Sequence, residues 1–169
     1  WSLARLRVVW LLILIVASTL TVSVLQFFEG SLERVTALAL FIPLLVGTGG
    51  NVGAQAATSA VRALAVNEVR PQDAWRVAWR ESRVGLLLGI TLGMVGLVAG
   101  WLVASLPVGL TVAIAVLAVC TWAATVGALM PLAAKSLRID PAVISSPLVT
   151  TLVDATGLVT YFLVAGVLL

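Results

Sequence analysis

The sequence contains no histidine and only one cysteine, Cys120, among its 169 residues. These absences exclude His-based acid–base catalysis, disulfide frameworks and the usual zinc sites, which need several Cys or His ligands. Charged residues are also scarce, at 10% of the chain, whereas about a quarter of the residues in soluble domains are charged. An ordinary water-soluble globular domain is therefore excluded.

Long apolar segments occupy most of the chain, because 62% of its residues are hydrophobic. About 20 apolar residues are enough to cross a bilayer as a helix. None of the apolar segments shows the strict alternation of polar and apolar residues that membrane barrel strands require. We therefore predict an all-α integral membrane domain over 1–169 with five transmembrane helices. The predicted spans are 8–28, 35–66, 84–105, 108–134 and 142–168.

The basic residues predict the orientation of these spans. Eight of them precede the first span or lie in the loops after the second and fourth spans, and only Arg34 lies in a loop on the other side. Short cytoplasmic loops carry an excess of Lys and Arg, which predicts a cytoplasmic N-terminus and an outside C-terminus in a cell (inner or plasma) membrane. The net charge of +3 is explained by this bias. Membrane lipid is the expected surrounding, and no nucleic-acid partner is expected.

Two segments indicate anchoring and packing. In 72–83, Trp75 and Trp79 share one helical face and the arginines share another, which predicts a short amphipathic helix in the membrane interface. In the third span, Gly85, Gly89 and Gly93 repeat every four residues, a spacing that lets helix backbones approach closely. We expect the third span to pack against another helix.

The second span contains unusual residues for a membrane helix, including Pro43, four glycines and two amides. At helical spacing, Asn51, Gln55 and Thr58 form one polar stripe. The range 35–66 is longer than a hydrocarbon core, so we expect tilt, extension past the membrane or a break near the glycines. Two interpretations remain: a packing notch with hydrogen bonds between helices, or a pore lining. The predicted pore-lining residues are Asn51, Gln55, Gly50, Gly53, Thr58 and Thr151.

The fifth span contains Asp154, an acid deep within an apolar segment. An ionised carboxylate in hydrocarbon is costly unless it faces water, a cation or a partner. Thr150 and Ser146 precede it by four and eight residues, which places two hydroxyls and one carboxylate on one helix face. Such oxygen ligands suit a hard cation, Mg²⁺ or Ca²⁺. The alternative is a protonated Asp154 that donates a hydrogen bond across the bundle.

One carboxylate is too few to remove the water shell of Mg²⁺, which dehydrates reluctantly. A symmetric homodimer would place two copies of Asp154 around one axis, as in the carboxylate rings of cation channels. We therefore expect a homodimer with the pore at the subunit interface. The ion would pass largely hydrated, with Asp154, Thr150 and Ser146 as the metal-site residues.

Two motifs resemble those of the MgtE magnesium channels. The range 43–55, PLLVGTGGNVGAQ, is similar to the second-span signature of that family, a proline followed by GGN-x-G-x-Q. The range 140–157, DPAVISSPLVTTLVDATG, is similar to the fifth-span block, D-P-A, then P-x-x-T-T, then D-x-x-G. The resemblance implies a homodimeric Mg²⁺ channel lined by spans two and five of both subunits, with Asp154 as the pore aspartate. Mg²⁺ would be the transported ion.

The resemblance also implies partners outside this chain. Family members usually carry an N-terminal cytoplasmic domain and paired CBS domains that close the pore when Mg²⁺ is high. The sequence begins at Trp1, so we expect a fragment of a longer protein whose regulatory domains are missing here. A second ion site at Glu68 and Asp140 is one interpretation of those acids, and solvated loop charges are the other.

Alternative functions differ in energetics or class. A cation-coupled Mg²⁺ exchanger would use the same motifs. A non-transporting membrane anchor would fit spans one, three and four, but it would leave Asp154 and the glycines of the second span unexplained. No enzyme is expected, because no nucleophile–base pair is visible in the sequence.

Overall fold

The computed structural model describes residues 2–141 and 146–169, except for the side chains of Ser2, Leu3, Leu6, Arg7, Ser31, Glu33, Arg34 and Ser146. Its elements, in chain order, are α1 (Ser2–Phe27), α2 (Glu29–Arg34), α3 (Ala37–Ala65), η1 (Pro71–Asp73), α4 (Ala74–Val103), α5 (Leu106–Ser136) and α6 (Ser146–Leu168). Five of these helices are long and apolar enough to cross a membrane. The predicted all-α fold with five apolar helices is confirmed for the described residues, and the chain is a multi-pass membrane protein.

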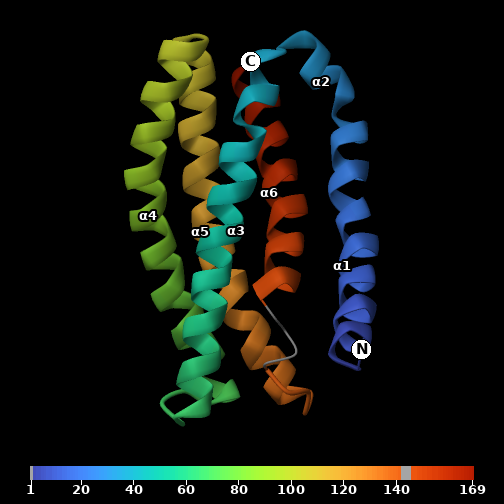
Figure 1. The fold of residues 1–169 in the computed structure, drawn as a ribbon. Coiled ribbons are helices and arrows are strands. Elements are labelled where there is room, and N and C mark those ends of the chain that lie inside the picture. Colours follow the sequence, from blue (N-terminus) through green and yellow to red (C-terminus); the bar gives the residue numbers. More distant parts are fainter. Residues whose placement is uncertain (1, 142–145) are drawn as a thin grey trace.

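The five long helices stand side by side and alternate in direction, so that the two chain ends lie at opposite ends of the bundle (Figure 1). Helix α5 is central, because it packs against α3, α4 and α6. Helix α1 stands at the edge and contacts α6. The apolar stretch of α1 is only 6% buried, against 50% for that of α5, so α1 presents most of its surface to the surroundings of the bundle.

Helices α4 and α5 approach closely through glycine. A Cβ atom added to Gly89 would lie 2.8 Å from Leu117 Cα, and one added to Gly85 would lie 2.6 Å from the Cys120 carbonyl oxygen. Real Cβ atoms essentially never come so close to another backbone, so these positions require glycine for this packing. The close packing predicted for the third span is confirmed.

One local expectation was wrong, and one of three options for the second span is excluded. The segment 72–83 is not a separate helix: Pro71–Asp73 forms one 3₁₀ turn, and α4 then runs without interruption from Ala74 to Val103. The reason is that 74–84 contains no glycine or proline that would end a helix. In the second span a break near the glycines is excluded, because α3 is continuous from Ala37 to Ala65. Its glycines keep helical backbone angles, since none has a positive φ.

Candidate cation site

Asp154 lies in α6, eight residues after its first residue, Ser146, or about 12 Å along the helix axis. Its side chain is half-buried. The Oδ1 atom is fully buried and has no hydrogen-bond partner among the described residues. Leaving a buried polar atom unpaired costs about 1–3 kcal/mol, and more for a charged group. The position therefore favours a positively charged or proton-donating partner for this oxygen.

The backbone of α3 packs directly against this carboxylate. A Cβ atom on Gly50 would lie 3.2 Å from Asp154 Oδ1 and 3.3 Å from Thr150 Cγ2. One turn further along α3, a Cβ atom on Gly53 would lie 3.2 Å from side-chain carbons of both Val149 and Val153. The glycines of the second span thus let α3 approach the face of α6 that carries the acid.

The threonine hydroxyls near Asp154 are arranged as acceptors. Thr150 Oγ1 and Thr151 Oγ1 each donate a hydrogen bond to the Pro147 carbonyl oxygen, at 2.9 Å. Because each hydroxyl proton is used within the helix, its oxygen lone pairs can accept a hydrogen bond or contact a cation. The structure brings Thr150 and Asp154 together at Gly50. Ser146 begins α6, but its side chain lies outside the described residues.

The polar stripe of α3 lies on the outer surface of the single chain. Asn51, Gln55 and Thr58 are exposed, whereas Val52 and Ala56 on the opposite side of α3 are buried. The Thr58 hydroxyl donates a hydrogen bond to the carbonyl oxygen of Ala54, one turn earlier in the same helix. Among the hydrogen bonds of the described residues none involves the side chains of Asn51 or Gln55. The close packing of the packing-notch interpretation is present at Gly50 and Gly53, but its hydrogen bonds between helices are not seen within the described part of one chain. Exposed amides are poorly suited to hydrocarbon, which favours water or protein against this face.

Two hydrogen bonds link α6 to its neighbours. The Tyr161 hydroxyl donates to the Leu38 carbonyl oxygen of α3 at 3.0 Å. Trp122 Nε1 of α5 donates to Thr156 Oγ1, two residues after Asp154, at 3.0 Å. No pattern in the sequence indicates the Trp122–Thr156 pair, because its partners are 34 residues apart and meet only once α5 packs against α6.

Comparison with known proteins shows the family of the chain. A family model described as MgtE, divalent cation transporter, matches residues 42–164, which include Gly50 and Asp154. The chain belongs to the MgtE family. It is 46% identical to the magnesium transporter MgtE of Thermus thermophilus, over 99% of this chain and 37% of that protein.

Two further MgtE relatives match nearly the whole chain. The magnesium transporter MgtE of Enterococcus faecalis is 35% identical over 96% of this chain and 36% of its own length. That of Bacillus subtilis is 30% identical over 94% of this chain and 36% of its own length. The chain thus spans little more than a third of these MgtE proteins. The relatives are named as transporters, and no catalytic family is indicated.

Proposed function

We propose that this MgtE-family chain forms the pore of a homodimeric Mg²⁺ channel in which the ion passes, largely hydrated, beside Asp154. The relatives it matches are named magnesium transporters. The observation that carries the proposal is the buried, unpaired Asp154 Oδ1, which lies against the α3 backbone at Gly50. An anionic oxygen in this position within a membrane helix is expensive unless a cation offsets it.

The number of ligands favours a hydrated ion. Mg²⁺ takes six oxygen ligands in near-ideal octahedral geometry and gives up its water reluctantly. Asp154 offers its negative charge and the carboxylate oxygen other than the buried Oδ1, and Thr150 offers one hydroxyl oxygen whose proton is already donated to Pro147. These two oxygens can accept hydrogen bonds from the water shell of the ion. The carboxylate then supplies charge, and the hydroxyl supplies orientation.

A second copy of the chain would complete the path. Asn51 directly follows Gly50, whose backbone lies against Asp154, and both Asn51 and Gln55 are exposed on one face of α3. If two copies meet along this face, the amides line a water-filled passage instead of contacting lipid. Two Asp154 carboxylates around the two-fold axis then offset the double charge of the ion.

The membrane potential is sufficient to drive uptake through such a passage. Moving one charge across 100 mV changes its free energy by about 2.3 kcal/mol, and hence a divalent ion by about 4.6 kcal/mol. A channel therefore needs no second ion. If Mg²⁺ flux into vesicles occurs only when a sodium or proton gradient is imposed, the exchanger alternative replaces the channel.

The test is Asp154→Asn, which keeps the size of the side chain and removes its charge. Mg²⁺ influx into proteoliposomes, followed with an entrapped Mg²⁺-sensitive dye, should fall to the level of empty vesicles. The matched control is Glu81→Gln, because Glu81 is a buried acid of α4 that is paired with Arg80. We expect this control to keep its influx. Unchanged influx in a folded Asp154→Asn variant would remove the carboxylate from the mechanism.

A further inference from the structure

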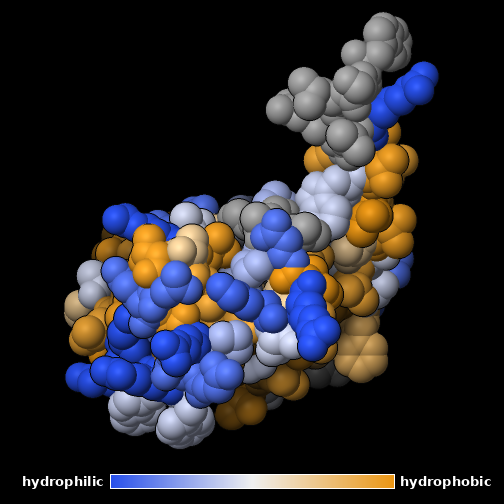
Figure 2. Space-filling view, turned by 90° about the horizontal axis from the view of Figure 1, so that it is seen from below, coloured by the Kyte–Doolittle hydropathy of each residue, from blue (hydrophilic) through white to orange (hydrophobic). Residues whose placement is uncertain are grey.

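A cavity of about 670 Å³ lies at the lower end of the bundle in Figure 1, between the segment that follows α3 and the first turns of α4. Three arginines of α4, Arg76, Arg80 and Arg83, contribute to its lining, and so do the acids Glu68 and Asp73. Viewed from below, hydrophilic side chains gather over this end of the bundle together with apolar ones (Figure 2). The residues of the candidate cation site do not line this cavity.

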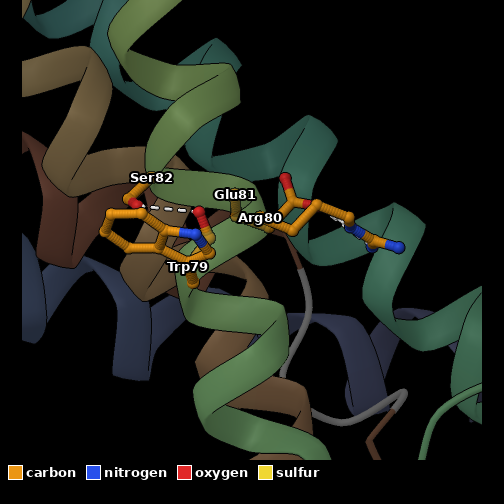
Figure 3. A network of polar contacts seen from close by, with 4 residues as sticks. All are labelled: Trp79, Arg80, Glu81 and Ser82. Carbon is orange, nitrogen blue, oxygen red and sulfur yellow. Dashed lines mark hydrogen bonds and ion pairs between the residues drawn. The ribbon is translucent and has the colours of Figure 1, made fainter.

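The three arginines form a row along one face of α4. They are four and three residues apart, which spreads their Cα atoms over about 10 Å of helix. Arg80 is engaged, since its Nη2 lies 3.0 Å from Glu81 Oε1 (Figure 3). Among the described residues, Arg76 and Arg83 form no ion pair. Two guanidinium groups of the row are thus available to a ligand.

The charges of the helix end also favour an anion. Helix α4 begins at Ala74 and has no acid in its first turn. Arg76 lies in that turn, so its charge adds to the positive end of the helix dipole instead of offsetting it. Asp73, the N-cap residue, offsets part of this charge, and its Oδ2 accepts a hydrogen bond from the Arg70 backbone N–H at 2.9 Å. The lining still contains three arginines against two acids. Glu68 is the remaining acid of the lining.

The wall of the cavity changes from charged to apolar along α4. Arg83 is followed by Val84 and, one turn later, Leu87, which also line the cavity and are 43% and 66% exposed. Trp79, which is 61% exposed, lies beside the arginine row, and indoles of membrane proteins gather at headgroup depth. A free phosphate ion would make no favourable contact with the apolar wall. A phospholipid can place its phosphate at the arginines and its acyl chain along the apolar wall.

We propose that this cavity binds one anionic phospholipid, whose phosphate contacts Arg76 and Arg83 and whose acyl chain lies along Val84 and Leu87. Basic pockets at the membrane surface bind lipid headgroups by the same electrostatics. This site is separate from Asp154, and the proposal does not depend on ion conduction. Its failure and that of the proposed channel function are therefore independent.

The experiment is native mass spectrometry of the detergent-solubilised protein with added phosphatidylglycerol or phosphatidylcholine. The double variant Arg76→Gln/Arg83→Gln is compared with Arg5→Gln/Arg138→Gln, which removes the same charge outside the cavity lining. An arginine near a lipid surface contributes about a fivefold factor in binding, so the cavity variant should bind phosphatidylglycerol at least about tenfold more weakly. The wild-type protein and the control should retain it, and phosphatidylcholine should bind far more weakly to both.

Two further measurements test whether the site binds a whole lipid or only a phosphate group. Leu87→Gln should weaken phosphatidylglycerol binding several-fold, because the acyl chain loses apolar contact. Millimolar inorganic phosphate should not displace the bound lipid. Equal phosphatidylglycerol binding by the cavity variant and the control would overturn the proposal. Displacement by inorganic phosphate, or equal binding of phosphatidylcholine, would also overturn it.

Discussion

Adding one methyl group at Gly50 should impair Mg²⁺ transport, because the space beside Asp154 is already filled. In Gly50→Ala, the new Cβ would lie 3.2 Å from Asp154 Oδ1 and 3.3 Å from Thr150 Cγ2, whereas ordinary contacts begin near 3.4 Å. The carboxylate or the whole of α6 must then move by a few tenths of an ångström. The matched control is Gly166→Ala, near the end of α6, where a Cβ would meet nothing within 4 Å.

The size of the effect follows from the cost of overpacking. Inserting a methyl group into a filled interior typically costs about 1–3 kcal/mol. If the methyl group destabilises the ion-bound state by about 1.4 kcal/mol relative to the ion-free state, the apparent affinity for Mg²⁺ falls about tenfold. The assay is the initial rate of Mg²⁺ influx into proteoliposomes as a function of external Mg²⁺, with equal amounts of correctly inserted protein.

The comparison of the two alanine variants decides the outcome. We expect Gly50→Ala to shift the half-saturating Mg²⁺ concentration upward and Gly166→Ala to leave it unchanged. Equal curves for the two variants would refute the reasoning, because the contact between α3 and the carboxylate would then have no consequence for the ion.

Two other predictions concern packing and the exposed amides. Gly89→Ala should lower the thermal unfolding midpoint in detergent, since its Cβ would lie 2.8 Å from a backbone atom of α5, whereas Gly166→Ala, with nothing within 4 Å, should not. Overpacking there should cost about 1–3 kcal/mol, and equal midpoints would contradict the close packing of α4 on α5. Replacing Asn51 and Gln55 together by Leu should reduce Mg²⁺ influx and leave helix content, measured by circular dichroism, unchanged. Undiminished influx would mean that this face meets lipid.

Hydropathy and periodicity were sufficient to predict several features of this chain. Because a span must be apolar over about 20 residues, the sequence indicated five long helices. Because residues four apart share a helix face, it also placed Thr150 beside Asp154 and aligned Gly85 with Gly89. Each of these inferences depends only on contacts within one helix or on the length of an apolar run.

Features that depend on contacts between helices could not be predicted in this way. That Gly50, among the four glycines of α3, meets the carboxylate follows from how α3 packs on α6. The composition of α1 likewise does not predict that this helix lies at the edge of the bundle. Hydropathy shows where a chain leaves the bilayer but not where a helix ends, since polar residues in water can continue it. For that reason 72–83 was predicted as a separate helix although α4 runs through it.

The central claim is that a hydrated divalent cation passes beside Asp154 between two copies of the chain. The most direct measurement is anomalous diffraction from crystals of the protein grown with Mn²⁺ in place of Mg²⁺. We predict a peak on a two-fold axis about 4–5 Å from both Asp154 carboxylates, the distance of one metal–water bond plus one hydrogen bond. A saturating Mn²⁺ concentration without a peak there, or an Asp154 side chain directed at lipid, would contradict the account.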